Sequence, residues 1–266
     1  MSRRRRPTVS IGGTGGCALG GDDRGVSDVV GYVLVFSLIT ITIGTVFAVG
    51  ITGVEDRREA ERVENVERAF DVFDDNVRDV QRYDDPGRST EIRLSGGTLS
   101  LTETTTVTLR NETGDVVLQR EHRSLTYANG DATVAYETGA WFRGDGDGAV
   151  MRSEPRFVAA GDRTTLPLVL LYPVGDATAR GDGTVQVGAS RRSTIGSDYT
   201  DAGDGPYELR IDSTYADAWE RYFDRTDGFD VNETATESAD GAVVVDLTDD
   251  DAVYVPRIAL DVSLRR

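Results

Sequence analysis

This chain lacks the residues for most acid–base and Schiff-base schemes. The sequence has one histidine, His122, and one cysteine, Cys17, and all 29 of its basic residues are arginine. Catalysis by lysine is therefore excluded, and no nucleophile elbow, P-loop or His/Cys cluster occurs. We expect His122 to be an exposed residue at the end of a strand. The sequence predicts no catalytic residue, no enzyme activity and no cofactor.

Two acidic runs could attract divalent cations. Asp145 and Asp147 lie in a Gly-Asp-Gly-Asp-Gly turn, and three consecutive carboxylates stand at residues 249–251. Calcium takes about six to eight oxygen ligands, and neither run supplies a complete loop. Acidic turns are also expected in a chain with 46 acidic residues. We therefore predict no metal site.

The charge balance limits the partners of the chain. The formal net charge is -17, and the only basic block is residues 3–6. Binding to DNA or RNA depends on Lys and Arg that neutralise phosphates, so we expect no nucleic-acid partner. An acidic, lysine-free composition is typical of adaptation to molar salt, where the Debye length is about 3 Å and carboxylates repel one another weakly. A GC-rich genome is the alternative, but it explains only the arginine.

An uncharged apolar stretch lies near the N-terminus, at residues 29–54. About 20 helical residues cross the hydrocarbon core of a bilayer, so the stretch predicts one transmembrane helix and the lipid bilayer as a partner. Arginines flank it on both sides, and residues 3–6 favour an inside N-terminus and an extracellular C-terminal domain. Small residues four apart on one face predict close helix packing, unless they are simply common in this helix. They are Thr40, Gly44, Ala48 and Thr52.

The next stretch has the seven-residue repeat of an amphipathic helix. Its apolar residues stand alternately three and four apart, as at the a and d positions of a heptad. These seam residues are Val63, Val66, Phe70, Phe73, Val77 and Val80. We expect one helix from about Val29 to Tyr83, ended by Asp-Asp-Pro-Gly. The seam packs either on the sheet of its own chain, which we favour, or on another subunit.

From Thr90 onward the apolar period becomes two, which is typical of strands. Residues 166–172 are nearly all apolar and predict a strand buried on both faces. Residues 215–224 predict a short helix whose aromatic side chains pack on the sheet. The sequence thus predicts an α+β fold, in which a long N-terminal transmembrane and stalk helix precedes a mostly antiparallel β domain. The expected parts are a leader at 1–25, the transmembrane helix at 26–54, an amphipathic stalk helix at 55–83 and an acidic β domain at 84–266.

Two Asn-x-Thr sequons are candidate glycosylation sites if the β domain is exported. They begin at Asn111 and Asn232.

The residues just before the apolar stretch read Arg24-Gly25-Val26-Ser27-Asp28. This segment resembles the processing site of haloarchaeal type IV pilin-like precursors, although Asp28 replaces the proline that those proteins have there. The resemblance implies cleavage between Gly25 and Val26, so that the whole apolar helix stays in the mature protein. It also implies prepilin peptidase and other pilin-like subunits as partners.

The sequence as a whole favours a single-pass, membrane-anchored, pilin-like surface protein. Its role would be structural, adhesive or that of a filament subunit. The alternative is a membrane-anchored extracellular binding protein that does not polymerise.

Overall fold

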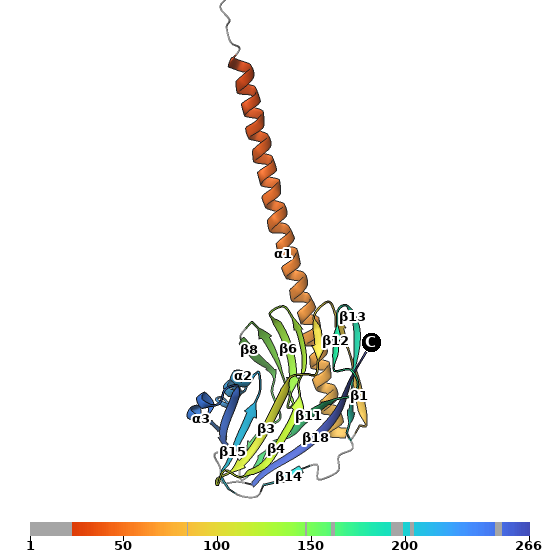
Figure 1. Ribbon diagram of the computed structural model, residues 1–266, viewed down its shortest axis with the longest axis vertical. Helices are drawn as coiled ribbons and strands as arrows, with labels where there is room; N and C mark the ends of the chain where they lie inside the picture. The colour runs from red at the N-terminus through yellow and green to blue at the C-terminus, as the bar shows by residue number, and fades with distance from the viewer. Residues whose placement is uncertain are drawn as a thin grey trace, which may run out of the picture. The chain divides into compact units, whose positions relative to one another are not determined.

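The first element is one long helix, α1 (Asp23–Tyr83), shown in Figure 1. It ends immediately before the Asp-Asp-Pro-Gly stop, as predicted. The computed structural model describes residues 23–83, 85–146, 148–160, 163–192, 199–202, 205–247 and 252–266, and within α1 it describes the side chains of residues 29–48, 58 and 60–83. The chain forms two compact units, Met1–Asp56 and Arg57–Arg266, and α1 contributes to both. We describe each unit by itself and call the second one the head.

The described strands of the head form three sheets. The seven-stranded sheet contains β1 (Gly87–Leu94), β9 (Val158–Ala160), β10 (Arg163–Thr165), β11 (Leu168–Pro173), β13 (Gly183–Arg191), β14 (Tyr199–Asp201) and β18 (Ala252–Arg265). The six-stranded sheet contains β2 (Thr98–Ser100), β5 (Leu125–Asn129), β6 (Ala132–Glu137), β7 (Ala140–Asp145), β8 (Gly148–Ser153) and β12 (Thr178–Arg180). The five-stranded sheet contains β3 (Thr104–Asn111), β4 (Val116–Arg123), β15 (Tyr207–Asp212), β16 (Phe229–Val231) and β17 (Ala242–Leu247).

Most strand pairs are antiparallel, so the predicted α+β layout is confirmed. The exceptions lie along β18, which pairs in parallel with β10 and β11. This strand also pairs antiparallel with β13 and β14. β18 therefore joins four other strands of the seven-stranded sheet.

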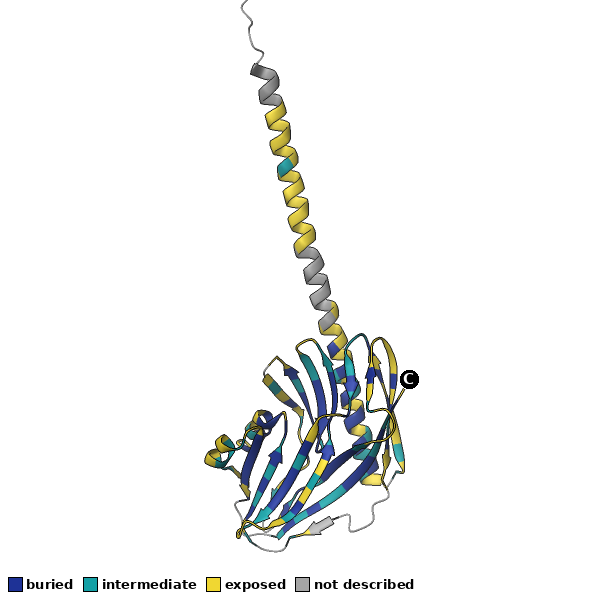
Figure 2. Ribbon diagram, in the orientation of Figure 1, coloured by how far each residue is buried: buried dark blue, intermediate teal, exposed yellow. Residues whose placement is uncertain are grey.

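The first of two hydrophobic cores lies around the part of α1 that belongs to the head. Figure 2 shows the buried stripe on this part of the helix. All six seam residues are buried there, together with alternate residues of β1, β13 and β18 such as Ile92, Val187 and Leu260. The seam packs on strands of its own chain.

The second core lies around the five-stranded sheet and a short helix, α2 (Ala216–Phe223). The aromatic residues of α2 are buried against the sheet, as predicted, and Trp219 stacks on Phe157 with ring centroids 6.0 Å apart. A second short helix, α3 (Glu233–Ser238), precedes β17.

Four strands contribute side chains to both cores: β18 does so with its two halves, and β6, β7 and β11 do so with alternate residues. In β11, Val169 and Leu171 lie in the first core, while Leu168 and Leu170 lie in the second. This confirms the prediction of a strand that is buried on both faces. β6 and β7 divide their side chains in the same way, so the two cores share a layer of strands.

Candidate functional site

The apolar segment is long and apolar enough to span a membrane. Val29–Ala48 has a mean hydropathy of 2.2, and none of its residues is buried. The hydroxyl groups of Thr40, Thr42 and Thr45 each donate a hydrogen bond of 2.8 Å to the carbonyl oxygen four residues earlier. Polar groups in lipid must be satisfied internally, and these bonds meet that requirement. This one helix could anchor the chain in a membrane.

The small-residue face occupies the same segment. Thr40 and Gly44 lie on it, and a side chain built at Gly44 would meet no atom within 4 Å. Gly44 has no side chain, so its position would let a second helix backbone approach closely. Ala48 continues this face, whereas the side chain of Thr52 lies outside those described.

A buried carboxylate interrupts the apolar surface of α1 inside the head. Asp74 is 3 % exposed. Its Oδ2 atom accepts a hydrogen bond of 2.7 Å from Ser153 Oγ and forms an ion pair with Arg78, whose Nη2 atom is 2.8 Å away. Its Oδ1 atom has no hydrogen-bond partner among the described residues. Burial raises the pKa of Asp74 to about 6, against the opposing effects of the Ser153 hydroxyl and the Arg78 guanidinium.

A second buried carboxylate, Glu137, lies at the end of β6. Its Oε2 atom accepts hydrogen bonds from Thr105 Oγ1 at 2.6 Å and from Ser124 Oγ at 2.7 Å. Its Oε1 atom accepts one from Trp219 Nε1 at 2.8 Å and one from Ser213 Oγ. All five side chains are buried, so this network ties distant parts of the chain together and presents no surface to a substrate.

His122 lies beside this network. It lies near the end of β4, as predicted, but it is 1 % exposed, so the prediction that its side chain is exposed was wrong. Its Nδ1 atom is 3.2 Å from the Arg123 carbonyl oxygen, and its Nε2 atom is 2.9 Å from Thr138 Oγ1. Because a carbonyl oxygen can only accept, Nδ1 carries the proton and Nε2 accepts from the threonine. Burial lowers the pKa of His122, and the Glu137 carboxylate opposes that effect.

A protein-family model matches residues 24–263, and its description is "Family of unknown function (DUF7289)". The chain belongs to this family. The matched region of this DUF7289 chain includes the apolar segment, the seam and both buried carboxylates.

One curated relative shares part of the sequence. A stretch of 78 residues is 28% identical to an uncharacterized protein of Archaeoglobus fulgidus. The match covers 29% of the DUF7289 chain and 26% of that protein, so the chain spans about a quarter of the relative that it matches. No solved structure matches the chain.

Several residues singled out from the sequence lie partly or wholly outside the residues that the structure describes. Arg24, Gly25 and Val26 fall within the first residues of α1, and their side chains lie outside those described. Cys17, Asp147 and residues 249–251 lie outside the described residues. Within the described part of the chain, no group of three or more His, Cys, Asp or Glu side chains could hold a metal ion.

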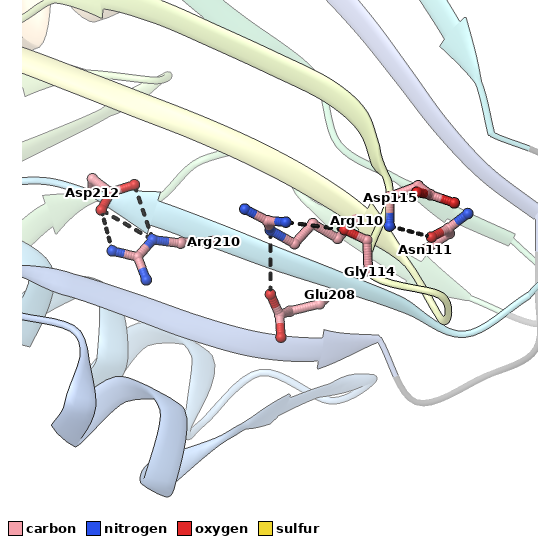
Figure 3. A network of polar contacts seen from close by, with 7 residues as sticks. All are labelled: Arg110, Asn111, Gly114, Asp115, Glu208, Arg210 and Asp212. Atoms are coloured by element: carbon pink, nitrogen blue, oxygen red, sulfur yellow. Dashed lines mark hydrogen bonds and ion pairs between the residues drawn. The ribbon is translucent and has the colours of Figure 1, made fainter.

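The two sequons occupy different kinds of turn. Asn111 ends β3, and its Oδ1 atom accepts hydrogen bonds from the Asp115 backbone N–H at 2.7 Å and from Thr113 Oγ1 at 2.8 Å. Figure 3 shows this turn, in which Arg110 donates to the Gly114 carbonyl and faces Glu208.

Asn232 instead caps α3. Its Oδ1 atom accepts a hydrogen bond of 3.1 Å from the Ala235 backbone N–H, and its Nδ2 atom donates one to Asp246. The Nδ2 atom is the one to which a glycan would be attached, and glycosylation of Asn232 would leave it a single N–H for the bond to Asp246.

The raised pKa of Asp74 predicts a pH dependence of stability. Between pH 3.8 and about 6 the folded head binds more protons at this residue than the unfolded chain does. The free energy of unfolding therefore falls as the pH rises through this window, by about 3 kcal/mol in total. We expect Asp74→Asn to remove this contribution and to make the protein more stable than wild type at pH 7.5. Denaturant unfolding of the full chain in detergent, measured at pH 4 to 8, would test this.

The control for this prediction is Asp75→Asn. Asp75 is the adjacent residue, and its side chain is 78% exposed. This variant should keep most of the pH dependence of wild type, because burial is the largest cause of the raised pKa of Asp74 and the charge of Asp75 is a smaller one. If the free energy of unfolding of Asp74→Asn depends on pH as that of wild type does, the pKa of Asp74 is not raised in the folded head.

Proposed function

We propose that this protein is a single-pass, membrane-anchored surface protein with a pilin-like layout. Its apolar helix lies in the bilayer, its head lies outside the cell, and its role is structural, adhesive or that of a filament subunit. The observation that carries the proposal is an exposed apolar segment in the same helix as a seam that is buried in the head. The resemblance of residues 24–28 to a pilin-like processing site supports the assembly role.

In such an assembly, the apolar helices of neighbouring subunits would pack on each other through the small-residue face. In lipid, helices associate through close backbone packing rather than through the hydrophobic effect. The lack of a side chain at Gly44 suits this kind of contact. The head would contribute little to a helical bundle, because its seam is already covered by its own strands.

That last observation also supports the second candidate, a membrane-anchored extracellular binding protein that does not polymerise. A buried seam is not available for a coiled coil between subunits. The two candidates differ in the state of the protein in detergent. The first predicts multimers that depend on the apolar helix, and the second predicts monomers.

The test is expression of the full chain in an archaeal host that has a prepilin peptidase. We expect the protein in the membrane fraction, released only by detergent, with Val26 as the mature N-terminus. Protease added to intact cells should digest the head. Recovery of the intact chain from the detergent-free soluble fraction would overturn the anchor, and an intact Met1 would remove the main support for the pilin-like role.

Two pairs of variants sharpen this test. Gly25→Leu should block cleavage, whereas Gly31→Ala, beyond the cleavage site, should not. Gly44→Leu should reduce crosslinked multimers in detergent, because a large side chain would fill the packing face. Val46→Leu, which changes another exposed residue of the same segment, is the matched control. Monomers in wild type would exclude the filament role in favour of the second candidate.

A further inference from the structure

An arginine-lined hollow lies at the C-terminal end of α1, within the head. Its volume is about 360 Å³, which is at the small end of the range for ligand pockets. The lining residues are Gln81, Arg82, Arg156, Pro167, Arg191, Pro256, Arg257 and Ile258. Four of these eight are arginines, and no described residue that lines the hollow is a carboxylate. In a chain with a net charge of -17, this lining is unusually rich in arginine.

The fold explains how these four arginines come to line one hollow. Arg82 lies in the last turn of α1, where the negative end of the helix dipole favours a cation. Arg191, at the end of β13, donates a hydrogen bond of 3.2 Å to the Val80 carbonyl oxygen near the same helix end. Arg257 lies on β18, and Arg156 lies in the segment before β9. Pro167, Pro256 and Ile258 add an apolar wall.

A small inner hollow adjoins the arginine-lined one. The two share Gln81, Arg156 and Pro167 as lining residues. The inner hollow has a volume of about 10 Å³, roughly the space for one water molecule, and Asp74 lines it. The Oδ1 atom of Asp74 is buried and has no hydrogen-bond partner among the described residues. Leaving such an atom unpaired is unfavourable, so this position favours a hydroxyl group or a water molecule that donates to it.

We propose that the hollow binds a small hydroxylated anion, such as a sugar acid or a sugar phosphate. Its carboxylate or phosphate group lies among the arginines, whose planar forks match both groups. Its ring lies against the apolar wall of two prolines and an isoleucine. One of its hydroxyl groups, directly or through one water molecule, donates to Asp74. This site would serve the protein whether or not it polymerises.

The experiment is calorimetric titration of the full chain in detergent with glucuronate, glucose 6-phosphate, glucose and inorganic phosphate. We expect one or both sugar anions to bind with a Kd below about 10 mM and glucose not to bind. Arg156→Gln should weaken that binding at least about tenfold, because it removes the charge of one of the four arginines that line the hollow. Asp74→Asn should weaken the binding of the sugar anions but not that of inorganic phosphate, because phosphate makes no hydroxyl contact with Asp74 and the loss of a nearby negative charge favours an anion.

The matched control is Arg93→Gln, which removes an exposed arginine of β1 outside the hollow. It should bind the sugar anions as wild type does. The proposal fails if neither sugar anion binds, or if Arg156→Gln binds as tightly as Arg93→Gln. If inorganic phosphate binds as tightly as glucose 6-phosphate, the hollow holds an anion but does not recognise hydroxyl groups, and that part of the proposal is overturned. Circular dichroism of each variant would show that the head remains folded.

Discussion

We expect Glu137→Ala to lower the free energy of unfolding by at least about 4 kcal/mol. The substitution removes both oxygen atoms that accept the four hydrogen bonds of the buried network. The hydroxyls of Thr105 and Ser124 are 2.9 Å apart and can pair with each other. The N–H group of Trp219 can only donate, and without Glu137 it loses its partner in the core. Denaturant unfolding of the full chain in detergent, followed by tryptophan fluorescence, would measure the loss.

Glu137→Gln is the informative control for this variant. Its amide oxygen can replace Oε1 and accept from Trp219 and Ser213. Its NH₂ group can replace Oε2, because the hydroxyls of Thr105 and Ser124 can turn to accept. We therefore expect wild type to be the most stable of the three proteins, Glu137→Gln to be less stable and Glu137→Ala to be the least stable. Equal stability of the alanine variant and wild type would show that the network does not hold the head together.

Phe73→Ala should lower the free energy of unfolding by about 3–5 kcal/mol. Phe73 is 1% exposed and lies in the middle of the seam. Its ring meets that of Tyr136 edge to face, with centroids 5.1 Å apart. The substitution leaves a cavity between α1 and β6 and also removes this aromatic contact. The same unfolding measurement would detect the change.

Val72→Ala is the matched control, on the same helix one residue away. Val72 is 52% exposed, so its truncation should change the free energy of unfolding by less than about 0.5 kcal/mol. Similar effects for the two variants would mean that the seam does not pack in the core. A full effect for Phe73→Ala in monomeric protein would show that the head needs no second subunit to cover the seam.

The helix and its seam could be predicted because their signals are local. The seam repeats along one stretch, and the Asp-Asp-Pro-Gly stop follows directly. The alternation of apolar residues after Thr90 likewise predicted strands, and β3, which contains Val107, and β15, which contains Leu209, are two of them. Their order could not be predicted, because pairing depends on which strands meet across long separations. β18, for example, lies parallel to β11, and Leu168 is opposite Arg257.

The buried polar groups were missed for a related reason. Glu137 ends β6, and the alternation of Val134 and Tyr136 predicts that its side chain points away from their core, so the sequence holds no local signal of its burial. Its partners come from four other parts of the chain, so no local pattern reveals that its carboxylate is satisfied. His122 was taken for an exposed residue because it stands beside Glu121 near a strand end. Only the fold brings Thr138 against its ring.

The position of β18 has a consequence for the order in which the head can form. This strand supplies the partners of β10, β11, β13 and β14, all of which come earlier in the chain. Contacts between residues this far apart in sequence form slowly, because a long loop must close before they stabilise the chain. If the head begins to fold while synthesis continues, the earlier strands must wait with an open sheet until β18 has been made. Such a chain depends on remaining soluble during this delay, and its excess of negative charge favours solubility.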